Sequence, residues 1–151
     1  MSLEIVPMQL ADLDEVKQLE DALFPVDAWT TDMFREELEQ VGISRDVMVA
    51  RINERIVGYV SFRYVGNEGD VNTIAVDANV QHQGVGTAMM NWLEENAIRR
   101  GVRELFLEVR SDNIPAIAMY LARDFERIDL RRDYYESGVD AYVMRKRLKN
   151  G

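Results

Sequence analysis

The sequence contains no cysteine and a single histidine, His82, among its 151 residues. Without cysteine the chain can form no disulfide, no thiolate nucleophile and no zinc ribbon. One histidine cannot build a multi-histidine metal site, so we expect no metal. Any catalysis must therefore use carboxylates, phenols, hydroxyls, amines and backbone amides, which favours direct group transfer over a covalent cysteine or serine relay.

Long apolar runs and an excess of positive charge are also missing. No stretch approaches the roughly 20 apolar residues that span a bilayer, and the first residues do not resemble a signal peptide. We therefore expect a cytoplasmic protein that does not contact membranes. The formal net charge of −9 argues against direct binding of nucleic acid, which needs a basic surface. No repeat or linker interrupts the sequence, which predicts one domain over residues 1–151. As a separate expectation, which the sequence does not determine, we take the protein to be a monomer or weak dimer.

Acidic side chains are concentrated in the first third of the chain. Residues 1–50 carry 12 acidic and 3 basic side chains, whereas residues 51–151 carry 15 of each. An acidic surface can attract a cationic amine or a basic protein tail. A solvated helical surface that keeps the protein soluble explains the same bias, and we favour this explanation on charge alone.

Apolar spacing and turn residues predict an α+β fold with the order β-α-α-β-β-β-α-β-α-β-β. A strand over residues 3–7 precedes two helices, of which the first ends before Pro25 and the second is capped by Thr30. Strands near 47–49, 56–64 and 70–76 form an antiparallel meander, with a tight turn at 53–54. A glycine-started helix, a strand over 104–110, a short helix from about 113 and strands near 125–132 and 140–148 follow.

Helical spacing also predicts which side chains of the four helices face the core. The predicted buried residues are Leu10, Leu13, Val16, Leu19 and Leu23, then Phe34, Leu38 and Val41, then Val85, Ala88, Met89, Trp92, Leu93 and Ala97, and finally Ile117, Ala118 and Leu121.

A glycine-containing segment lies between the third strand of the meander and the next helix. It reads Gln81-His82-Gln83-Gly84-Val85-Gly86-Thr87. A helix N-terminus presents unpaired N–H groups and the positive end of a dipole, which suits a phosphate, and glycine lets the backbone approach it closely. By itself such a segment more often marks a tight turn. It lacks the lysine of a P-loop, and Met89 stands at the third glycine position of a dinucleotide-binding fingerprint.

A carboxylate lies on the strand over 104–110. Leu107 and Val109 share one face of this strand, so Glu108 points to the opposite face. Such a carboxylate marks either a solvated face or a functional cleft, and the solvated face is the commoner case. In the following helix, Asn113 is either a plain N-cap or a ligand contact, and Tyr120 is either a core or a functional tyrosine.

Together these segments resemble the GNAT superfamily of N-acetyltransferases. The chain reads Ile74-Ala75-Val76-Asp77, then Q-x-x-G-x-G, then LEVR-S-x-N-x-x-A-I-A-x-Y. Within the superfamily the match is to the RimI-type ribosomal-protein-alanine N-acetyltransferases. It runs from residue 72 to 125 and returns at 131–135, 140–144, 24–25 and 29–30. The resemblance implies a mixed, mostly antiparallel seven-stranded sheet, flanked by four helices and splayed between the fourth and fifth strands.

The resemblance also implies a set of cofactor contacts. Acetyl-CoA is the cosubstrate of similar enzymes, and its pantetheine arm lies beside Ile74, Ala75 and Val76, where the backbone N–H of Val76 meets the thioester carbonyl. Asn113 matches a residue that contacts the cofactor. The backbone amides expected to hold the pyrophosphate belong to His82, Gln83, Gly84, Val85, Gly86 and Thr87.

For the chemistry, the resemblance implies that Glu108 is the general base, acting through water, and that Tyr120 is the general acid. Trp29, Tyr134 and Tyr135 are candidates to line the acceptor slot; for Trp29, ordinary packing is an equal alternative. This sequence departs from the family at His82 and Thr87, where arginines are common. A further departure is Arg123-Asp124, which replaces Leu-Gly and implies a local loss of stability, because Asp adopts the left-handed conformation less readily than Gly.

The resemblance implies that the acceptor is a protein N-terminus, of a ribosomal protein. An α-amine with a pKa near 8 is partly neutral at pH 7, so a modest base suffices. Two alternatives stay open. The chain can acetylate a small-molecule amine or a protein lysine instead, since one fold serves many acceptors. It can also be a non-catalytic module that binds acyl-CoA.

Overall fold

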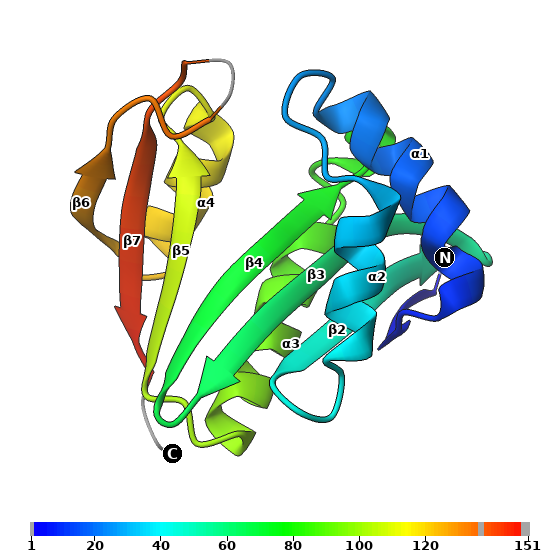
Figure 1. The fold of residues 1–151 in the computed structure, drawn as a ribbon, viewed down its shortest axis with the longest axis horizontal. Helices are drawn as coiled ribbons and strands as arrows, with labels where there is room; N and C mark the ends of the chain where they lie inside the picture. The colour runs from blue at the N-terminus through cyan, green and yellow to red at the C-terminus, as the bar shows by residue number, and fades with distance from the viewer. Residues whose placement is uncertain (1, 136–137, 149–151) are drawn as a thin grey trace.

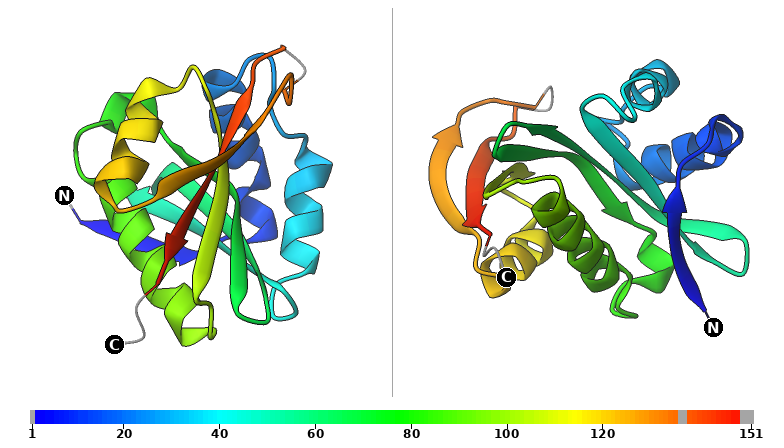
Figure 2. Two further views of the ribbon diagram at one scale, coloured as in Figure 1. Left: turned by 90° about the vertical axis from the view of Figure 1, so that its left-hand side faces the viewer. Right: turned by 90° about the horizontal axis from the view of Figure 1, so that it is seen from below.

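The computed structural model describes residues 2–135 and 138–148, which form a seven-stranded sheet with two helices on each face (Figures 1 and 2). The strands are β1 (Leu3–Pro7), β2 (Arg45–Ile52), β3 (Arg55–Val65), β4 (Glu68–Val76), β5 (Glu104–Arg110), β6 (Glu126–Arg131) and β7 (Ala141–Arg147). The helices are α1 (Leu13–Leu23), α2 (Thr31–Glu39), α3 (Val85–Arg99) and α4 (Ile114–Ala122), with short 3₁₀ turns η1 (Leu10–Asp12) and η2 (Ala78–Val80).

The sheet has the spatial order β1-β2-β3-β4-β5-β7-β6. Among the described strands, β4 and β5 form the one parallel pair, and every other neighbouring pair is antiparallel. Helix α3 makes the crossover between the two parallel strands, which antiparallel neighbours do not need. The predicted α+β class, element order and mixed sheet are therefore confirmed.

Strands β2, β3 and β4 form the predicted meander, and β1 pairs with the outer edge of β2. The turn between β2 and β3 falls at Asn53 and Glu54, whose φ angles are both positive, at 52° and 68°. Positive φ at both central residues gives a two-residue turn the twist that fits an antiparallel hairpin.

Helices α1 and α2 cover one face of the sheet, and α3 and α4 cover the other (Figure 2). The core on the first face includes Val16, Phe34 and Tyr59. The core on the second face is larger and includes Leu93 and Leu105. A core on both faces explains why β3, which lies between them, is buried along most of its length.

Four of the predicted core side chains are exposed instead. Leu10 is 66% exposed because it lies in η1, ahead of α1 and off its apolar stripe. Val41 is 48% exposed because α2 ends at Glu39. In α4 the inward side follows Tyr120 and Ile117, so Leu121, at 53%, and Ala118 turn to solvent.

The sheet opens between β4 and β5. Their ladder joins residues 68–71 to residues 104–107 and ends at the pair Val71 and Leu107. Beyond that pair β4 continues to Val76 against β3, while β5 continues to Arg110 against β7. Figure 1 shows the two strands diverging towards the end of the molecule that carries the α1–α2 segment. The predicted splay between the fourth and fifth strands is confirmed.

A β-bulge lies where this opening begins. Ser61 pairs with Thr73 and Phe62 pairs with Val71, so Asn72 is an extra residue in β4. A bulge bends its strand and re-aims the neighbouring side chains. Beyond it, Ile74 packs towards α3 and Ala75 packs towards α1.

Not all of the acidic first third is solvated surface. Asp12, Glu20 and Glu37 are buried. Two of these carboxylates form ion pairs with strand β2, Asp12 with Arg51 and Glu37 with Arg45. The interpretation of the charge bias as purely solvated surface is therefore wrong for these three residues.

Glu20 attaches the segment between α1 and α2 to the sheet. Its side chain is 2% exposed and accepts hydrogen bonds from the Trp29 backbone N–H, at 2.9 Å, and from the Tyr59 hydroxyl. Burial raises the pKa of Glu20, although both donors act in the opposite direction. Burial also raises the pKa of Tyr59, which therefore stays protonated and remains a donor.

We expect Glu20→Ala to lower the free energy of unfolding by about 2 kcal/mol, because a buried hydroxyl and a buried N–H lose their acceptor. Urea unfolding followed by circular dichroism measures the change. Asp21→Ala is the matched control: it removes the neighbouring carboxylate of the exposed Lys17 pair, and we expect about 0.5 kcal/mol or less. Equal losses for the two variants would contradict a structural role for Glu20.

Candidate active site

A cavity of about 600 Å³, the first cavity, occupies the opening between β4 and β5. Thirteen of the fifteen predicted site residues line it: Trp29, Ile74, Ala75, Val76, His82, Gly84, Val85, Gly86, Thr87, Glu108, Asn113, Tyr120 and Tyr135. Gln83 and Tyr134 do not line this cavity. Segments from opposite ends of the sequence therefore meet at one place, as the motifs predicted.

A second cavity of about 720 Å³ lies next to the first, on the side of α2 and the chain after β6. Six residues border both cavities: Trp29, Val71, Asn72, Leu107, Glu108 and Tyr135. Tyr134 lines the second cavity, so all three candidates for the acceptor slot border it. Glu108 thus lies where the two cavities meet.

Strand β4 directs unpaired backbone groups into the opening. The Asp77 N–H donates to the Val57 carbonyl at 2.8 Å, which makes these two residues a hydrogen-bonded pair of the β3–β4 ladder. Hydrogen-bonding direction alternates along an antiparallel strand, so the N–H and C=O groups of Val76 and Ile74 point away from β3. On that side β5 has already diverged, and a ligand can take the place of a strand.

The N-terminus of α3 closes one end of the first cavity. Gly84 caps this helix in the left-handed conformation, with φ 84°, and His82 also has a positive φ, 68°. The first N–H groups of a helix have no partner inside the helix, so they are available to an anion. Val85 also lines the cavity, and its side chain is buried in the core.

The turn before this helix is held by Asp77. Its carboxylate accepts the Asn79 N–H at 2.9 Å and pairs with Arg55 at 2.7 Å. These two contacts, the backbone hydrogen bond first, hold the pKa of Asp77 below its usual value. The anchored turn fixes where α3 begins relative to β4.

Glu108 is partly exposed to the cavities rather than to open solvent alone. Its side chain is 30% exposed, and its nearest ion-pair partner is the Arg131 Nε atom at 3.5 Å. A hydrogen bond with Glu108, together with burial, raises the pKa of Tyr134. Burial first, and then the charge of Glu108, raise the pKa of Asp70. Sequence analysis left two alternatives for Glu108, a solvated face of the sheet or a cleft. Its position at the junction of the two cavities favours the cleft.

Tyr120 lies deep in the first cavity. It is 4% exposed, packs against Phe125 with ring centroids 5.6 Å apart, and has no hydrogen-bond partner among the described residues. Burial raises its pKa, so the phenol stays protonated at neutral pH and can donate to a ligand. Burial also raises the pKa of Tyr135, to about 12.

Asn113 caps α4 and also lies at the first cavity. Its side-chain oxygen accepts the Ala116 N–H at 3.3 Å, which makes it the N-cap of α4, and the same residue lines the first cavity. Asp124 stands where the family pattern has glycine, and it has the left-handed conformation expected there, with φ 71°. Its neighbour Arg123 bonds to Glu94 at 2.9 Å and so links α4 to α3.

Sequence reasoning missed a connection formed by Arg110, at the end of β5. The guanidinium forms an ion pair with Asp27 of the α1–α2 segment and bonds to Asp112 at 3.0 Å. It also lies 5.2 Å from the centre of the Tyr135 ring. Arg110 was visible as the last residue of the LEVR motif, but its partners are distant in sequence and no spacing could identify them. Asn72 and Glu37 were missed for the same reason.

A mixed sheet that splits at its one described parallel pair, with a helix N-terminus at one end of the split, is the arrangement of the GNAT acetyltransferases. The chain belongs to this family: residues 13–125 match the acetyltransferase (GNAT) family.

The relatives agree with the RimI-type resemblance. The N-alpha-acetyltransferase RimI of Mycobacterium tuberculosis is 38% identical over 142 residues, which cover 90% of this chain and 87% of that protein. The ribosomal protein bS18-alanine N-acetyltransferase of Escherichia coli is 36% identical over 95 residues, 61% of this chain and 64% of that enzyme. A Mycobacterium leprae protein is 41% identical over 143 residues, but the match spans 38% of its length.

Solved structures agree as well. The ribosomal-protein-S18-alanine N-acetyltransferase of Escherichia coli superposes with a TM-score of 0.86 at 28% identity, covering 98% of this chain and 95% of that one. Ard1 from Thermoplasma volcanium superposes with a TM-score of 0.92 at 23% identity, covering 99% of each chain, and supports the fold alone. These likenesses confirm the predicted fold and bear out the prediction of an N-acetyltransferase.

Within residues 2–135 and 138–148, no helix is long and apolar enough to cross a membrane.

We expect Arg110→Ala to lower the free energy of unfolding by about 2 kcal/mol, because Arg110 and Asp27 are a largely buried pair, with side chains 23% and 11% exposed. Urea unfolding measures this change. Arg35→Ala removes an arginine from an exposed pair with Asp32, and we expect about 0.5 kcal/mol or less from that control. If Arg110→Ala were as stable as the control variant, the connection between the two segments would carry no stability.

Proposed function

We propose that this protein transfers the acetyl group of acetyl-CoA directly to the N-terminal α-amine of a protein, and that its natural acceptor is a ribosomal protein. The observation that carries the proposal is the opening between β4 and β5, into which β4 directs free backbone groups while Glu108 and Tyr120 line the same cavity. The named RimI-type relatives support the acceptor class. The proposal places the enzyme in the cytoplasm, where ribosomal proteins are made.

The cavity fits acetyl-CoA in its chemistry. The α3 N-terminus offers the backbone N–H groups of His82 and of residues 84–87 for the phosphates. The predicted contribution of Gln83 is less favourable, because its N–H donates to the Val80 carbonyl at 3.3 Å and the residue does not line the cavity. Gly86 adds no side chain to the cavity wall. A Cβ atom at Gly86 would lie 3.6 Å from Met119 and 3.7 Å from Val76, so the glycine leaves open space rather than relieving a clash. Ile74, Ala75 and Val76 would flank the pantetheine arm, and Asn113 would contact it from α4. Bound acetyl-CoA supplies an activated acetyl carbon.

Three protein groups would take part in the acetyl transfer itself. The Val76 N–H donates to the carbonyl oxygen of the thioester and stabilises the negative charge that develops there. Glu108, through a water molecule, accepts a proton from the attacking amine. Tyr120 donates to the sulfur, so the new C–N bond forms as the C–S bond breaks and CoA leaves as a thiol. Trp29, Tyr134 and Tyr135 line the second cavity, where the rest of the acceptor would lie.

Two substitutions test these roles. We expect Glu108→Gln to lower kcat/KM about 100-fold, because the amine loses its proton acceptor. We expect Tyr120→Phe to lower kcat about 10-fold or more while acetyl-CoA binding, measured by calorimetry, stays near that of the wild type.

Matched controls are Glu104→Gln, on the same face of β5 but outside both cavities, and Tyr142→Phe, on β7 and also outside them. Both controls should retain wild-type kinetics. Wild-type rates in the Glu108 and Tyr120 variants would refute the assigned roles.

The acceptor is tested with a panel of amines and purified protein, followed by CoA release and mass spectrometry of the products. Peptides with a free N-terminal alanine should be acetylated best, because their α-amine is partly neutral at pH 7. The same peptides with a blocked N-terminus and an internal lysine, and the polyamine spermine, should react slowly. A preference for either of these would replace the proposed acceptor. In cells, deletion of the gene should remove the acetyl group from the N-terminus of one ribosomal protein.

A further inference from the structure

Asn72 lies at the start of the opening between β4 and β5, across from the proposed catalytic base Glu108. It is the extra residue of the β4 bulge and directly follows Val71, the last residue of β4 that pairs with β5. Glu108 directly follows Leu107, the partner of Val71. Asn72 and Glu108 are therefore the first residues on either side of the opening, and both border both cavities.

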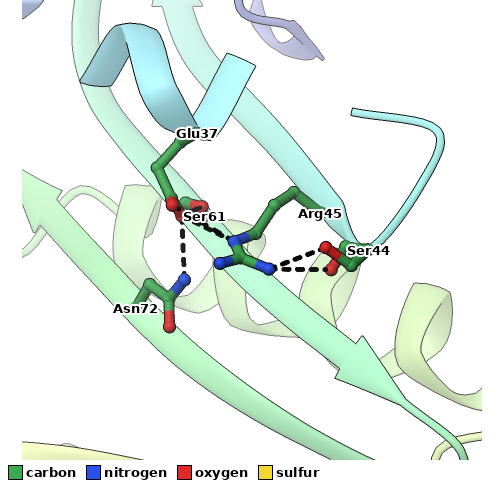
Figure 3. Close-up of polar contacts among 5 residues, drawn as sticks. All are labelled: Glu37, Ser44, Arg45, Ser61 and Asn72. Carbon is green, nitrogen blue, oxygen red and sulfur yellow. Dashed lines mark hydrogen bonds and ion pairs between the residues drawn. The ribbon is translucent and has the colours of Figure 1, made fainter. Parts of the chain in front are cut away.

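The side chain of Asn72 is held in one orientation by Glu37 of α2. The Asn72 Nδ2 atom donates to the Glu37 Oε1 atom at 2.8 Å, and the same oxygen accepts the Ser61 hydroxyl at 2.7 Å (Figure 3). Glu37 is 8% exposed, and Arg45 Nε donates to both of its oxygens, at 3.2 and 3.1 Å. An ionised carboxylate can only accept, so the amide must turn its NH₂ group towards Glu37.

This orientation leaves the Asn72 Oδ1 atom free. Figure 3 shows the oxygen pointing away from Glu37. It has no hydrogen-bond partner among residues 2–135 and 138–148. A partly buried acceptor that the protein itself leaves unpaired, on the wall of a ligand cavity, suits a donor carried by the ligand.

We propose that Asn72 binds the acceptor: its Oδ1 atom accepts a hydrogen bond from one N–H of the attacking amine, and Glu37 acts as the positioning residue that keeps Oδ1 turned towards the amine. This inference rests on the proposed function. A neutral primary amine has two N–H groups and one lone pair. Glu108 receives the proton of one N–H, Asn72 binds the other, and the lone pair is left to attack the acetyl carbon. The product amide keeps the N–H that Asn72 holds.

The arrangement selects primary amines. A neutral secondary amine, such as an N-methylated N-terminus, has one N–H and cannot serve Glu108 and Asn72 together. A site built to hydrogen-bond a substrate N–H rejects an analogue that lacks it, because a polar group of the site then stays unpaired. Removal of the Asn72 carboxamide should therefore weaken both the binding of the acceptor and the rejection of its N-methyl form.

The test compares Asn72→Ala with the wild type, using peptides that begin with alanine and with N-methylalanine. We expect the KM of the alanine peptide to rise about tenfold, as for the loss of one hydrogen bond to a polar ligand, and the KM of acetyl-CoA to stay the same. The ratio of kcat/KM for the two peptides should fall towards one. Ser61→Ala is the matched control, because it removes a different donor from the same Glu37 oxygen and should leave both readouts unchanged.

The role of Glu37 is tested by a double-mutant cycle. If Glu37 acts through Asn72, Glu37→Ala should raise the peptide KM in the wild-type background and add little in the Asn72→Ala background. Additive effects would show that Glu37 has only a general structural role.

Two results would overturn the inference while leaving the proposed function intact: an active Asn72→Ala enzyme with unchanged peptide KM and unchanged discrimination, or a rise in the acetyl-CoA KM instead. If the wild type prefers spermine or a lysine to every N-terminus, the proposed acceptor is wrong, and the same comparison is made with that amine and its N-methyl form. If the wild type acetylates no amine, both proposals fail.

Discussion

The end of the β4–β5 ladder at Val71 and Leu107 is the feature on which the rest of this structure depends. Beyond it each strand keeps one antiparallel partner, β3 for β4 and β7 for β5, while no described strand pairs with their facing edges. Unpaired backbone groups in a sheet need other partners. The sheet thus opens where the β4–β5 ladder ends, the bulge at Asn72 marks the start of this opening, and the proposed function places the cosubstrate there.

Buried carboxylates keep the surroundings of that opening in place. Glu20 ties the α1–α2 segment to β3 through Tyr59, and Glu37 ties α2 to β2, β3 and β4. Burying a carboxylate is unfavourable unless donors surround it, and here each one accepts from groups on distant segments. The acidic bias of the first third therefore has a structural part as well as a solvated one. These contacts add to the apolar packing of α1 and α2 on the sheet and to the hydrogen bond from the Ile56 N–H to Glu15, at 2.7 Å.

The two cavities differ in the groups that line them. The first cavity is bounded by the α3 N-terminus, β4 and α4, and its chemistry is that of backbone N–H groups and a protonated phenol. The second is bounded by α2 and the chain after β6, and it is richer in charged side chains. Glu108 and Asn72 lie at the junction, one as a carboxylate and one as a carboxamide. Under the proposed function, proton acceptance by Glu108 and orientation of the amine by Asn72 would occur at this shared boundary.

The sequence by itself determined the element order, the two capped helices and the glycine turn before α3, because these features depend on periodicity, capping and φ preferences within a few residues. It also located Glu108, Asn113 and Tyr120 within motifs, although their shared cavity appeared only in the folded chain. Tertiary structure alone decided that Leu10, Val41, Ala118 and Leu121 are exposed and that Glu20 and Glu37 are buried. The exposure of Leu10 and Val41 follows from where α1 begins and α2 ends, which apolar spacing does not fix. The burial of Glu20 against Tyr59, the orientation of Asn72 by Glu37 and the ion pair of Arg110 with Asp27 depend on contacts between residues tens of positions apart, which no local pattern records.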